Sequence, residues 1–209
     1  MDFAFHNRQT LVVPRPRAFD EADAVVAAKE AFWDHGYVTT SVGDLEEATG
    51  LSRSSLYSTF TTKRDLFHAA LAVYLETFID PLLGPLEREG ADLREITRYF
   101  KRLETLFKEP RAQRGCLLIN TMGECAGRDA GLTRQLDEFL DRLRSAFANA
   151  LRPSVHAGLM TSREATEHAA LLGGAVVGVW LTVRVDPASA RTLCRSAAAQ
   201  VQSWITGAY

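Results

Sequence analysis

The chain has 209 residues, with 24 basic and 26 acidic side chains, which gives a formal net charge of −2. Hydrophobic residues make up 46% of it, so it can bury a substantial core. No charged-then-apolar leader opens the sequence, and its longest apolar stretch, residues 169–183, is shorter than the roughly 20 residues of a membrane-spanning helix. Three cysteines without paired spacing favour a reducing cytoplasm over a disulfide framework.

The first distinctive segment is LVVPRPR at residues 11–17. Its two prolines favour an extended backbone, and Arg15 and Arg17 alternate along it, so the segment could place two cations against DNA. The alternative is a disordered terminus, which suits residues 1–12. The sequence therefore predicts a flexible N-terminal arm at residues 1–18.

Residues 39–60, TTSVGDLEEATGLSRSSLYSTF, have the pattern of two short helices joined by a glycine-centred turn. Ser41 and Asp44 have the spacing of a capping box, which begins the first of these helices. Gly50 stands where a left-handed residue ends it. Three apolar side chains recur at helical spacing on its inner face: Val42, Leu45 and Ala48.

The second helix of this pair is expected to present small polar side chains outward. Ser52 can cap it, and Leu56 and Phe60 form its inner face. Short outer side chains let a helix enter the major groove of DNA, where arginine reaches guanine and hydroxyls contact bases or phosphates. The pattern therefore predicts a DNA-reading helix-turn-helix, and the alternative is a serine-rich helix that is merely solvated.

Residues 15–71 resemble the N-terminal domain of the TetR family of bacterial transcriptional regulators. The matching segments are RPRAFD at 15–20, AFWDHGY at 31–37, the pair of helices at 39–60, and KRDLF at 63–67. The resemblance implies DNA phosphate contacts from Thr40, Ser52, Tyr57 and Lys63. It implies base reading by Arg53, Ser54, Ser55 and Ser58.

Ser41, Arg15 and Arg17 complete the predicted DNA-binding set. Ser54 and Thr61 depart from the glycine and the proline or glycine common in the family near these positions, which leaves the operator sequence open. Residues 1–70 carry seven basic and ten acidic side chains, whereas a basic domain is the usual footprint of DNA binding. We therefore expect a modest dependence of DNA affinity on salt.

From residue 63 onward the pattern is helical, without an alternating strand pattern or an internal repeat. The fourth helix is predicted at about 63–80, where it stops or kinks at Pro81. Further helices are predicted at about 92–108, from Gly115, and at about 130–151, 162–184 and 187–206. The fold class is all-α, with about nine helices. With the resemblance, this predicts a DNA-binding domain at 19–65 and an effector-binding and dimerisation domain at 66–209.

The last two predicted helices favour a homodimer. Residues 162–184 are apolar on nearly every side, and three glycines there would let another helix approach closely: Gly173, Gly174 and Gly178. The final helix repeats apolar residues at helical steps: Leu193, Ala197, Val201, and Trp204 or Ile205. A four-helix bundle with a second copy would cover both helices, as the resemblance implies, while coverage within one chain is the alternative.

The resemblance also implies a small-molecule cavity among the middle helices. The candidate lining residues are Tyr74, Phe78, Phe100, Leu103, Phe107, Cys116, Asn120, Phe139, Phe147 and Trp180. Each of them has plain core packing as its alternative.

Cys116 stands in RGCLLINTMGEC at 114–125, which resembles a Gly-Cys-Leu segment of family members that sense electrophiles or oxidants. A helix start and two nearby arginines, Arg111 and Arg114, could lower its pKa, although a buried apolar cysteine is the alternative. A disulfide with Cys125 is excluded if the helix is continuous, because nine residues rise about 13.5 Å.

We therefore expect a cytoplasmic, homodimeric regulator of transcription, most simply a repressor that a small molecule or thiol-reactive signal releases from a palindromic operator. Its expected partners are double-stranded DNA and an effector, with no cofactor, metal or membrane. An all-α enzyme is the first alternative, but Glu164 and His168 share a helix face without HExxH or CxxC spacing. A nonspecific DNA-packaging protein is the second alternative.

Overall fold

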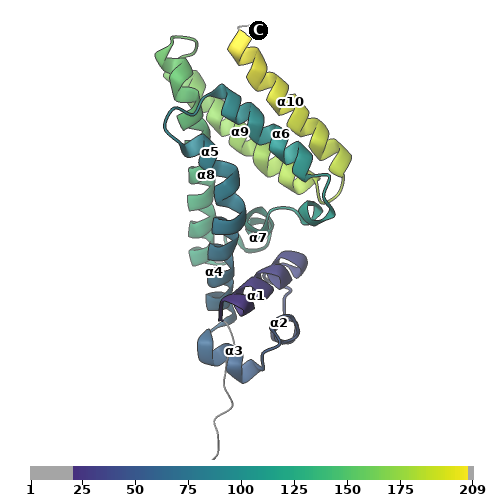
Figure 1. The fold of residues 1–209 in the computed structure, drawn as a ribbon. Helices are drawn as coiled ribbons and strands as arrows, with labels where there is room; N and C mark the ends of the chain where they lie inside the picture. Colours follow the sequence, from purple (N-terminus) through teal and green to yellow (C-terminus); the bar gives the residue numbers. More distant parts are fainter. Residues whose placement is uncertain (1–20, 207–209) are drawn as a thin grey trace, which may run out of the picture.

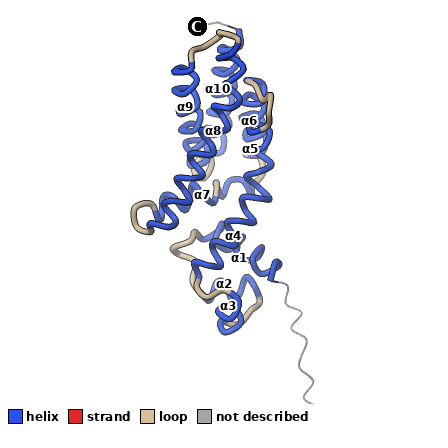
Figure 2. Tube along the Cα trace, turned by 90° about the vertical axis from the view of Figure 1, so that its left-hand side faces the viewer, coloured by secondary structure: helices blue, strands red, loops and turns tan. Residues whose placement is uncertain are grey.

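The computed structural model describes residues 21–206, so the predicted arm with Arg15 and Arg17 lies outside the described residues. Within this range the elements are helices and no strand is present, which confirms the all-α fold. Figure 1 shows α1–α3 grouped at one end of an elongated molecule, while α4 leads from this group into a larger bundle. Figure 2 shows the same division from the side.

The small group consists of α1 (Glu21–His35), α2 (Val42–Thr49) and α3 (Arg53–Thr59). The predicted caps are confirmed: Ser41 and Asp44 form a capping box on α2, Ser52 caps α3, and Gly50 ends α2 at φ 68°. Leu45 is buried as predicted, whereas Ala48 is exposed, because the short α2 turns only one narrow stripe inward.

A long central rod follows, made of α4 (Lys63–Tyr74), a π-helical turn η1 (Leu75–Ile79) and α5 (Asp80–Glu87). The sequence predicts a helix that stops or kinks at Pro81. It does not stop there, because the helix continues through Pro81 and Pro85. Proline cannot donate to the carbonyl four residues earlier, and the π-helical turn lies directly before it. The irregularity therefore changes the helical register without ending the rod.

The rest of the bundle is built from longer helices joined by short connections. These are α6 (Leu93–Leu106), the 3₁₀ turn η2 (Pro110–Arg114), α7 (Leu117–Cys125), α8 (Ala130–His156), α9 (Ser162–Thr182) and α10 (Pro187–Thr206). α8 is longer than predicted, since Pro153 is accommodated inside it. With α4, η1 and α5 as one rod, the described residues contain nine continuous helical segments besides the 3₁₀ turn, as predicted.

One buried cluster runs through the whole described chain, from Val25 in α1 to Trp204 in α10. It contains side chains of both predicted domains, such as Phe32 and Phe67, whose rings meet edge to face with centroids 4.9 Å apart. The α1–α3 group is therefore packed onto the bundle through apolar contacts, so a displacement of one part moves side chains that contact the other.

By length and composition alone, the rod Lys63–Glu87 could cross a membrane. In the folded chain 44% of its most apolar window is buried, including Phe67, Leu71 and Leu83. These side chains face α1, α8 and the other helices of the core, so the apolar composition of the rod is accounted for by packing.

Candidate DNA-binding surface and effector cavity

The helix predicted to read DNA, α3, turns its polar side chains outward. Only Leu56 within α3 is buried, and Phe60 at its end is buried beside it, so both predictions about the inner face are confirmed. The outer side chains are exposed or half-buried: Arg53, Ser54, Ser55, Tyr57 and Ser58. Their short reach leaves the backbone of α3 accessible, and the Arg53 guanidinium lies 5.8 Å from the Tyr57 ring centre.

The serine hydroxyls at the start of α3 form hydrogen bonds with one another. Ser52 Oγ lies 2.9 Å from Ser54 Oγ and 3.1 Å from Ser55 Oγ, and it accepts a bond from the Ser55 N–H. Ser58 Oγ donates to the Ser55 carbonyl over 2.8 Å. A hydroxyl can donate and accept at once, so these groups retain capacity for phosphate or base contacts.

The other predicted DNA contacts among the described residues flank α3 and differ in exposure. Ser41 is exposed at the cap of α2. Lys63 is half-buried, and its ammonium donates to the Val38 carbonyl and lies 4.9 Å from the Tyr37 ring centre. Thr40 is only 1% exposed, and its hydroxyl donates to the Gly36 carbonyl. In this conformation Thr40 supports the turn and presents no side chain to an outside partner.

Acidic side chains near α3 are engaged within the motif. Glu46 Oε1 accepts from the Arg53 N–H over 2.5 Å, which satisfies an unpaired donor at the start of α3. Asp44 accepts from the Ser41 N–H, and this backbone hydrogen bond is the main reason that the pKa of Asp44 lies below its ordinary value. The negative charge of the motif is therefore partly used in fixing its geometry.

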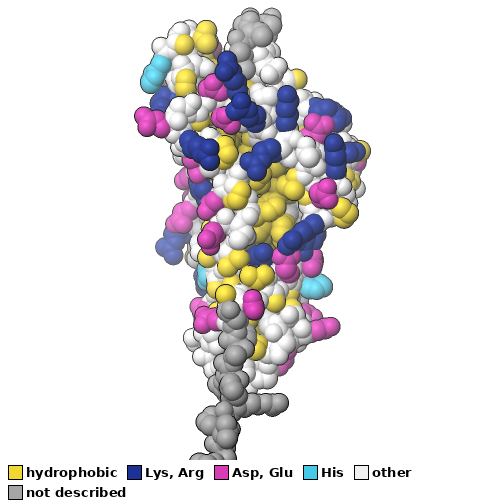
Figure 3. Space-filling view, in the orientation of Figure 1, with side chains coloured by type: hydrophobic (Ala, Val, Ile, Leu, Met, Phe, Trp, Pro, Cys, Tyr) yellow, Lys and Arg dark blue, Asp and Glu magenta, His cyan; other side chains and the backbone are white. Residues whose placement is uncertain are grey.

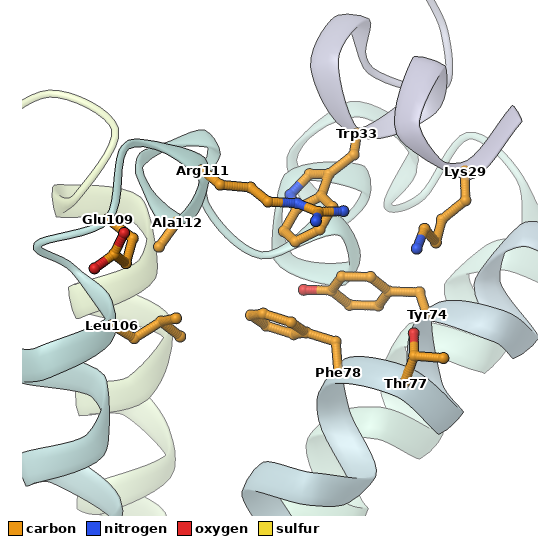
Figure 4. Close-up of a pocket in the computed structure, with 9 residues that line it drawn as sticks. All are labelled: Lys29, Trp33, Tyr74, Thr77, Phe78, Leu106, Glu109, Arg111 and Ala112. Carbon is orange, nitrogen blue, oxygen red and sulfur yellow. The ribbon is translucent and has the colours of Figure 1, made fainter. Parts of the chain in front are cut away.

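A cavity of about 400 Å³ lies where α1 meets the bundle, and we call it the α1-side cavity (Figure 4). Its lining residues are Lys29, Trp33, Tyr74, Thr77, Phe78, Leu106, Glu109, Arg111 and Ala112. They come from α1, from the α4–η1 rod, from the end of α6 and from the start of η2. A molecule bound there would contact the α1–α3 group and the bundle together.

An ion cluster beside this cavity ties η2 to α1. Arg114 donates to Glu30 Oε2 over 2.9 Å and to Asp34 Oδ1 over 2.6 Å, and Arg111 also pairs with Glu30. Burial raises the pKa of Glu30, but hydrogen bonds from Arg114 and Lys29 and the charges of Lys29 and Arg111 outweigh it, so the pKa is lowered. Glu30 is therefore ionised at neutral pH.

Further contacts between the two parts surround this cluster. The Trp33 indole N–H donates to the Gly115 carbonyl over 2.9 Å, and the Arg114 guanidinium lies 4.0 Å from the Trp33 ring centre. Gly115 has φ 84°, and a Cβ there would approach Arg184 Cδ to 2.8 Å and Asn120 Oδ1 to 2.9 Å. Only glycine fits this junction without displacing neighbours.

Among the predicted effector residues, Tyr74 and Phe78 line the α1-side cavity. Phe139 lines a separate cavity of about 220 Å³ between the rod, α7 and α8. Asn120 donates to the Arg114 carbonyl and accepts from Arg184, so its amide links the end of η2 to the segment that follows α9. The remaining predicted residues are buried and do not line the α1-side cavity: Phe100, Leu103, Phe107, Cys116, Phe147 and Trp180.

The sequence prediction missed seven of the lining residues: Lys29, Trp33, Thr77, Leu106, Glu109, Arg111 and Ala112. It selected mainly aromatic residues of the helices after residue 66, so it left out α1 and the connection that follows α6. Lys29 offered a signal, since it lies on the same face of α1 as Val25, Phe32 and Trp33, where a charge is unexpected. The contribution of η2 had no comparable signal, because its place beside α1 depends on the tertiary fold.

For Cys116 the structure agrees with the buried alternative rather than with a lowered pKa. Cys116 is fully buried at the cap of α7, and burial raises the pKa of its thiol although contacts with Tyr74 and the Ile119 N–H act in the opposite direction. Arg111 and Arg114 are directed at Glu30 and Trp33 instead. A buried, protonated thiol reacts slowly with electrophiles.

The cysteines are free, as the geometry of a continuous α7 requires for Cys116 and Cys125. Within the described residues, no group of histidine, cysteine or acidic side chains is placed to hold a metal ion.

An apolar groove of about 380 Å³ lies on the outer face of α9 and α10, and we call it the α9–α10 groove. Its lining residues are Leu171, Leu172, Ala175, Gly178, Val179, Leu193, Ser196, Ala197, Gln200 and Trp204. Leu171 is 62% exposed there. Gly178 has open space where a Cβ would lie, whereas a Cβ on Gly173 would meet Arg144, so Gly173 serves packing against α8.

Three comparisons relate this chain to known proteins. A family model described as "Bacterial regulatory proteins, tetR family" matches residues 24–70. The uncharacterized HTH-type transcriptional regulator YezE of Bacillus subtilis is 34% identical over 137 residues, which cover 66% of this chain and 71% of YezE. The HTH-type transcriptional repressor ComR of Escherichia coli is 36% identical over 107 residues, 51% of each protein.

Among solved structures, a cysteine mutant of the TetR family regulator CifR, crystallised with 26-bp operator DNA, superposes with a TM-score of 0.77 at 23% identity. The superposition covers 88% of this chain and 98% of that one. At this identity the likeness shows a shared fold, with an N-terminal helix-turn-helix and a helical C-terminal domain.

Proposed function

This chain belongs to the TetR family of bacterial regulatory proteins and is a DNA-binding transcriptional regulator rather than an enzyme, and we propose that it is a repressor. In this proposal two copies bind a palindromic operator through α3, and a small molecule in the bundle releases them. The name of ComR as a repressor supports the sign of regulation. The fully buried thiol of Cys116 favours a small molecule over a thiol-reactive signal.

The observation that carries the proposal is the outward display of α3. Leu56 anchors the helix to the core, and its arginine and three serine side chains remain on the surface within one short, capped helix. We assign base reading to Arg53, Ser54, Ser55 and Ser58. We assign phosphate contacts to Ser41, Ser52, Tyr57 and Lys63. Thr40 is buried and stabilises the turn that precedes α2.

The proposed dimer forms across the α9–α10 groove. A contiguous patch of exposed apolar side chains marks a surface suited to another protein, and here the exposed Leu171 and Leu193 line one groove together with Ala175 and Ala197. A two-fold axis that runs through this groove along the long axis of the molecule would place both α3 helices at the same end, because α3 lies at the end opposite the tip of α10 (Figure 1).

We propose the division of labour expected from the sequence, with DNA binding in residues 19–65, and effector binding and dimerisation in residues 66–209. The α1-side cavity adds Lys29 and Trp33 of the first domain to the effector site. We also propose that the protein works in the cytoplasm, where operator DNA is found.

Effector binding would act on DNA affinity by shifting a population of conformations. The rod α4–η1–α5 carries Lys63 and Arg64 at the DNA-binding end and Tyr74 and Phe78 in the α1-side cavity. Arg64 further joins the rod to the start of α8 through Asp129, at 2.8 Å. A ligand that favours a wider separation of the two α3 helices lowers DNA affinity by its differential affinity for the two states.

The test is fluorescence anisotropy of the full chain with DNA from its own upstream region and with a scrambled duplex, each at two salt concentrations. We expect specific binding to the upstream DNA and only a modest loss of it at higher salt. Arg53→Ala should weaken specific binding about 5- to 150-fold, the worth of a good arginine–base contact. The matched control Arg88→Ala, at the exposed end of α5, should bind like the wild type.

Equal, strongly salt-sensitive binding to both duplexes would indicate a packaging protein instead. No binding to the upstream DNA, or unchanged binding by Arg53→Ala, would contradict the proposed role of α3.

A further inference from the structure

The α1-side cavity contains an almost fully buried lysine. Lys29 is 7% exposed, and its ion-pair partner among the described residues is Glu30, whose Oε1 lies 3.1 Å from Nζ. Removing an ammonium from water is costly unless its charge is compensated. An ammonium carries three donors, and Figure 4 shows this one extending from α1 toward the cavity. Lys29 can therefore pair with an anion placed in the cavity.

Positive charge predominates among the residues that line this cavity and the groove beside it. The α1-side cavity has Lys29 and Arg111 against one acidic lining residue, Glu109. An adjoining groove of about 590 Å³ shares Leu106 and Glu109 with it and adds three cations: Arg98, Lys101 and Arg102. Figure 3 shows apolar side chains at mid-height of this face, with lysine and arginine side chains and some acidic side chains around them. Such a surface attracts anions and raises their local concentration.

The remaining wall of the cavity is aromatic and lies on the irregular part of the central rod. Trp33 meets Tyr74 and Phe78 edge to face, with ring centroids 5.0 and 5.3 Å apart. Thr77 and Phe78 belong to the π-helical turn η1. Such turns occur frequently at functional sites. The wall therefore suits the apolar body of a small molecule, and the volume of about 400 Å³ lies within the usual range of ligand sites.

We propose that the effector is an organic carboxylate with an aromatic or alkyl body. Its acid group pairs with Lys29 and Arg111, and its body lies against Trp33, Phe78 and Leu106. This inference rests on the proposed function and names the chemical class of its effector. The site lies against the DNA-binding domain, so the ligand acts at the junction of the two parts.

The same geometry supplies a route of regulation. Glu30 now accepts from Lys29, Arg111 and Arg114, and the contacts with Arg111 and Arg114 hold η2 against α1. A bound carboxylate competes with Glu30 for Lys29 and Arg111, which leaves Arg114 as the remaining tie of Glu30 to η2. A ligand that binds the loosened arrangement better shifts the population toward it, and the position of α1–α3 changes relative to the bundle.

Calorimetric titration of the full chain with two acids and their primary amides tests the ligand class. The probes are octanoate and 3-phenylpropionate, with octanamide and 3-phenylpropanamide as uncharged molecules of nearly the same shape. We expect at least one acid to bind at least about 10-fold more tightly than its amide, the worth of one charge-assisted contact.

Two variants locate the charge that makes this difference. Lys29→Met should remove most of the preference for the acid, and Arg111→Gln, at an exposed site that cannot disturb the core, should reduce it about 3-fold. Lys108→Met removes an exposed lysine that lines neither cavity nor groove and should leave the preference unchanged. Thermal melts of each variant identify any loss of folding, in which case Arg111→Gln alone decides.

The proposal is overturned if neither acid binds, if the amides bind as tightly as the acids, or if both Lys29→Met and Arg111→Gln keep the full preference. Anisotropy with the upstream DNA, run without and with each acid, separates this failure from failure of the proposed function. Unliganded protein that binds the DNA while the acids have no effect leaves a repressor with another effector. Unliganded protein that does not bind the DNA contradicts the proposed function itself.

Discussion

The α3 end and the α9–α10 end of the molecule both leave side chains exposed, but the chemistry of those side chains is opposite. On α3 the exposed groups are hydroxyls and one arginine, and the serine hydroxyls are hydrogen-bonded to one another and to the backbone. In the α9–α10 groove they are leucines, alanine and glycine, with Trp204 stacked on His168 at a ring separation of 3.9 Å.

The difference indicates two kinds of partner. A polar helix with short side chains keeps its water until a charged, hydrated surface such as DNA replaces that water. Covering an apolar groove with another surface is favourable by roughly 25 cal/mol for each Å² of apolar area that is removed from water. The first surface is suited to reversible binding and the second to lasting association.

The largest effect on this comparison should come from placing a charge in the groove. Leu171→Arg would bury an unpaired cation in each half of a symmetric interface, and we expect the dimer to weaken by about 3–5 kcal/mol, the cost of an uncompensated buried charge. Sedimentation analysis measures the change, and operator affinity should fall with it. Leu159→Arg is the matched control, because Leu159 is 61% exposed and lies outside the groove. If both variants remained dimeric, the interface would lie elsewhere.

The junction between the two ends is tested at a glycine. Gly115→Ala forces a side chain into a left-handed backbone conformation and against Arg184 and Asn120, so the free energy of unfolding should fall by about 2–3 kcal/mol. Gly90→Ala has a similar φ of 77° but open space around its Cβ position, so only backbone strain remains and the loss should be about 1 kcal/mol. Urea unfolding measures both, and equal losses would show that the close contacts of Gly115 do not matter.

The smallest effect separates two roles of Ser52, as a helix cap and as a phosphate contact. Asparagine and aspartate both cap helices well, so the free energies of unfolding of Ser52→Asn and Ser52→Asp should lie within about 0.5 kcal/mol of the wild-type value. Ser52→Asp also places a negative charge toward DNA, and its operator affinity should fall about 10-fold further than that of Ser52→Asn. Anisotropy titrations compare the two variants. Equal affinities would show that Ser52 acts as a cap alone.

The sequence by itself determined the helix-turn-helix, because its signals are local. A capping box, a left-handed glycine and a second cap lie within twelve residues, and each acts on backbone groups three or four positions away. The apolar stripe of α10 was readable for the same reason, since a helix repeats its faces at fixed steps.

The tertiary structure decided the α1-side cavity, the rod that continues past Pro81, and the state of Cys116. Lys29 and Arg111 are 82 positions apart, and no local pattern relates them. Pro81 is tolerated because the register shifts in η1 and the packed core holds the rod on both sides of it. The pKa of Cys116 depends on how deeply the thiol is buried, which only the assembled helices determine. Contacts between distant segments leave no periodic pattern in the sequence, so only the three-dimensional structure shows them.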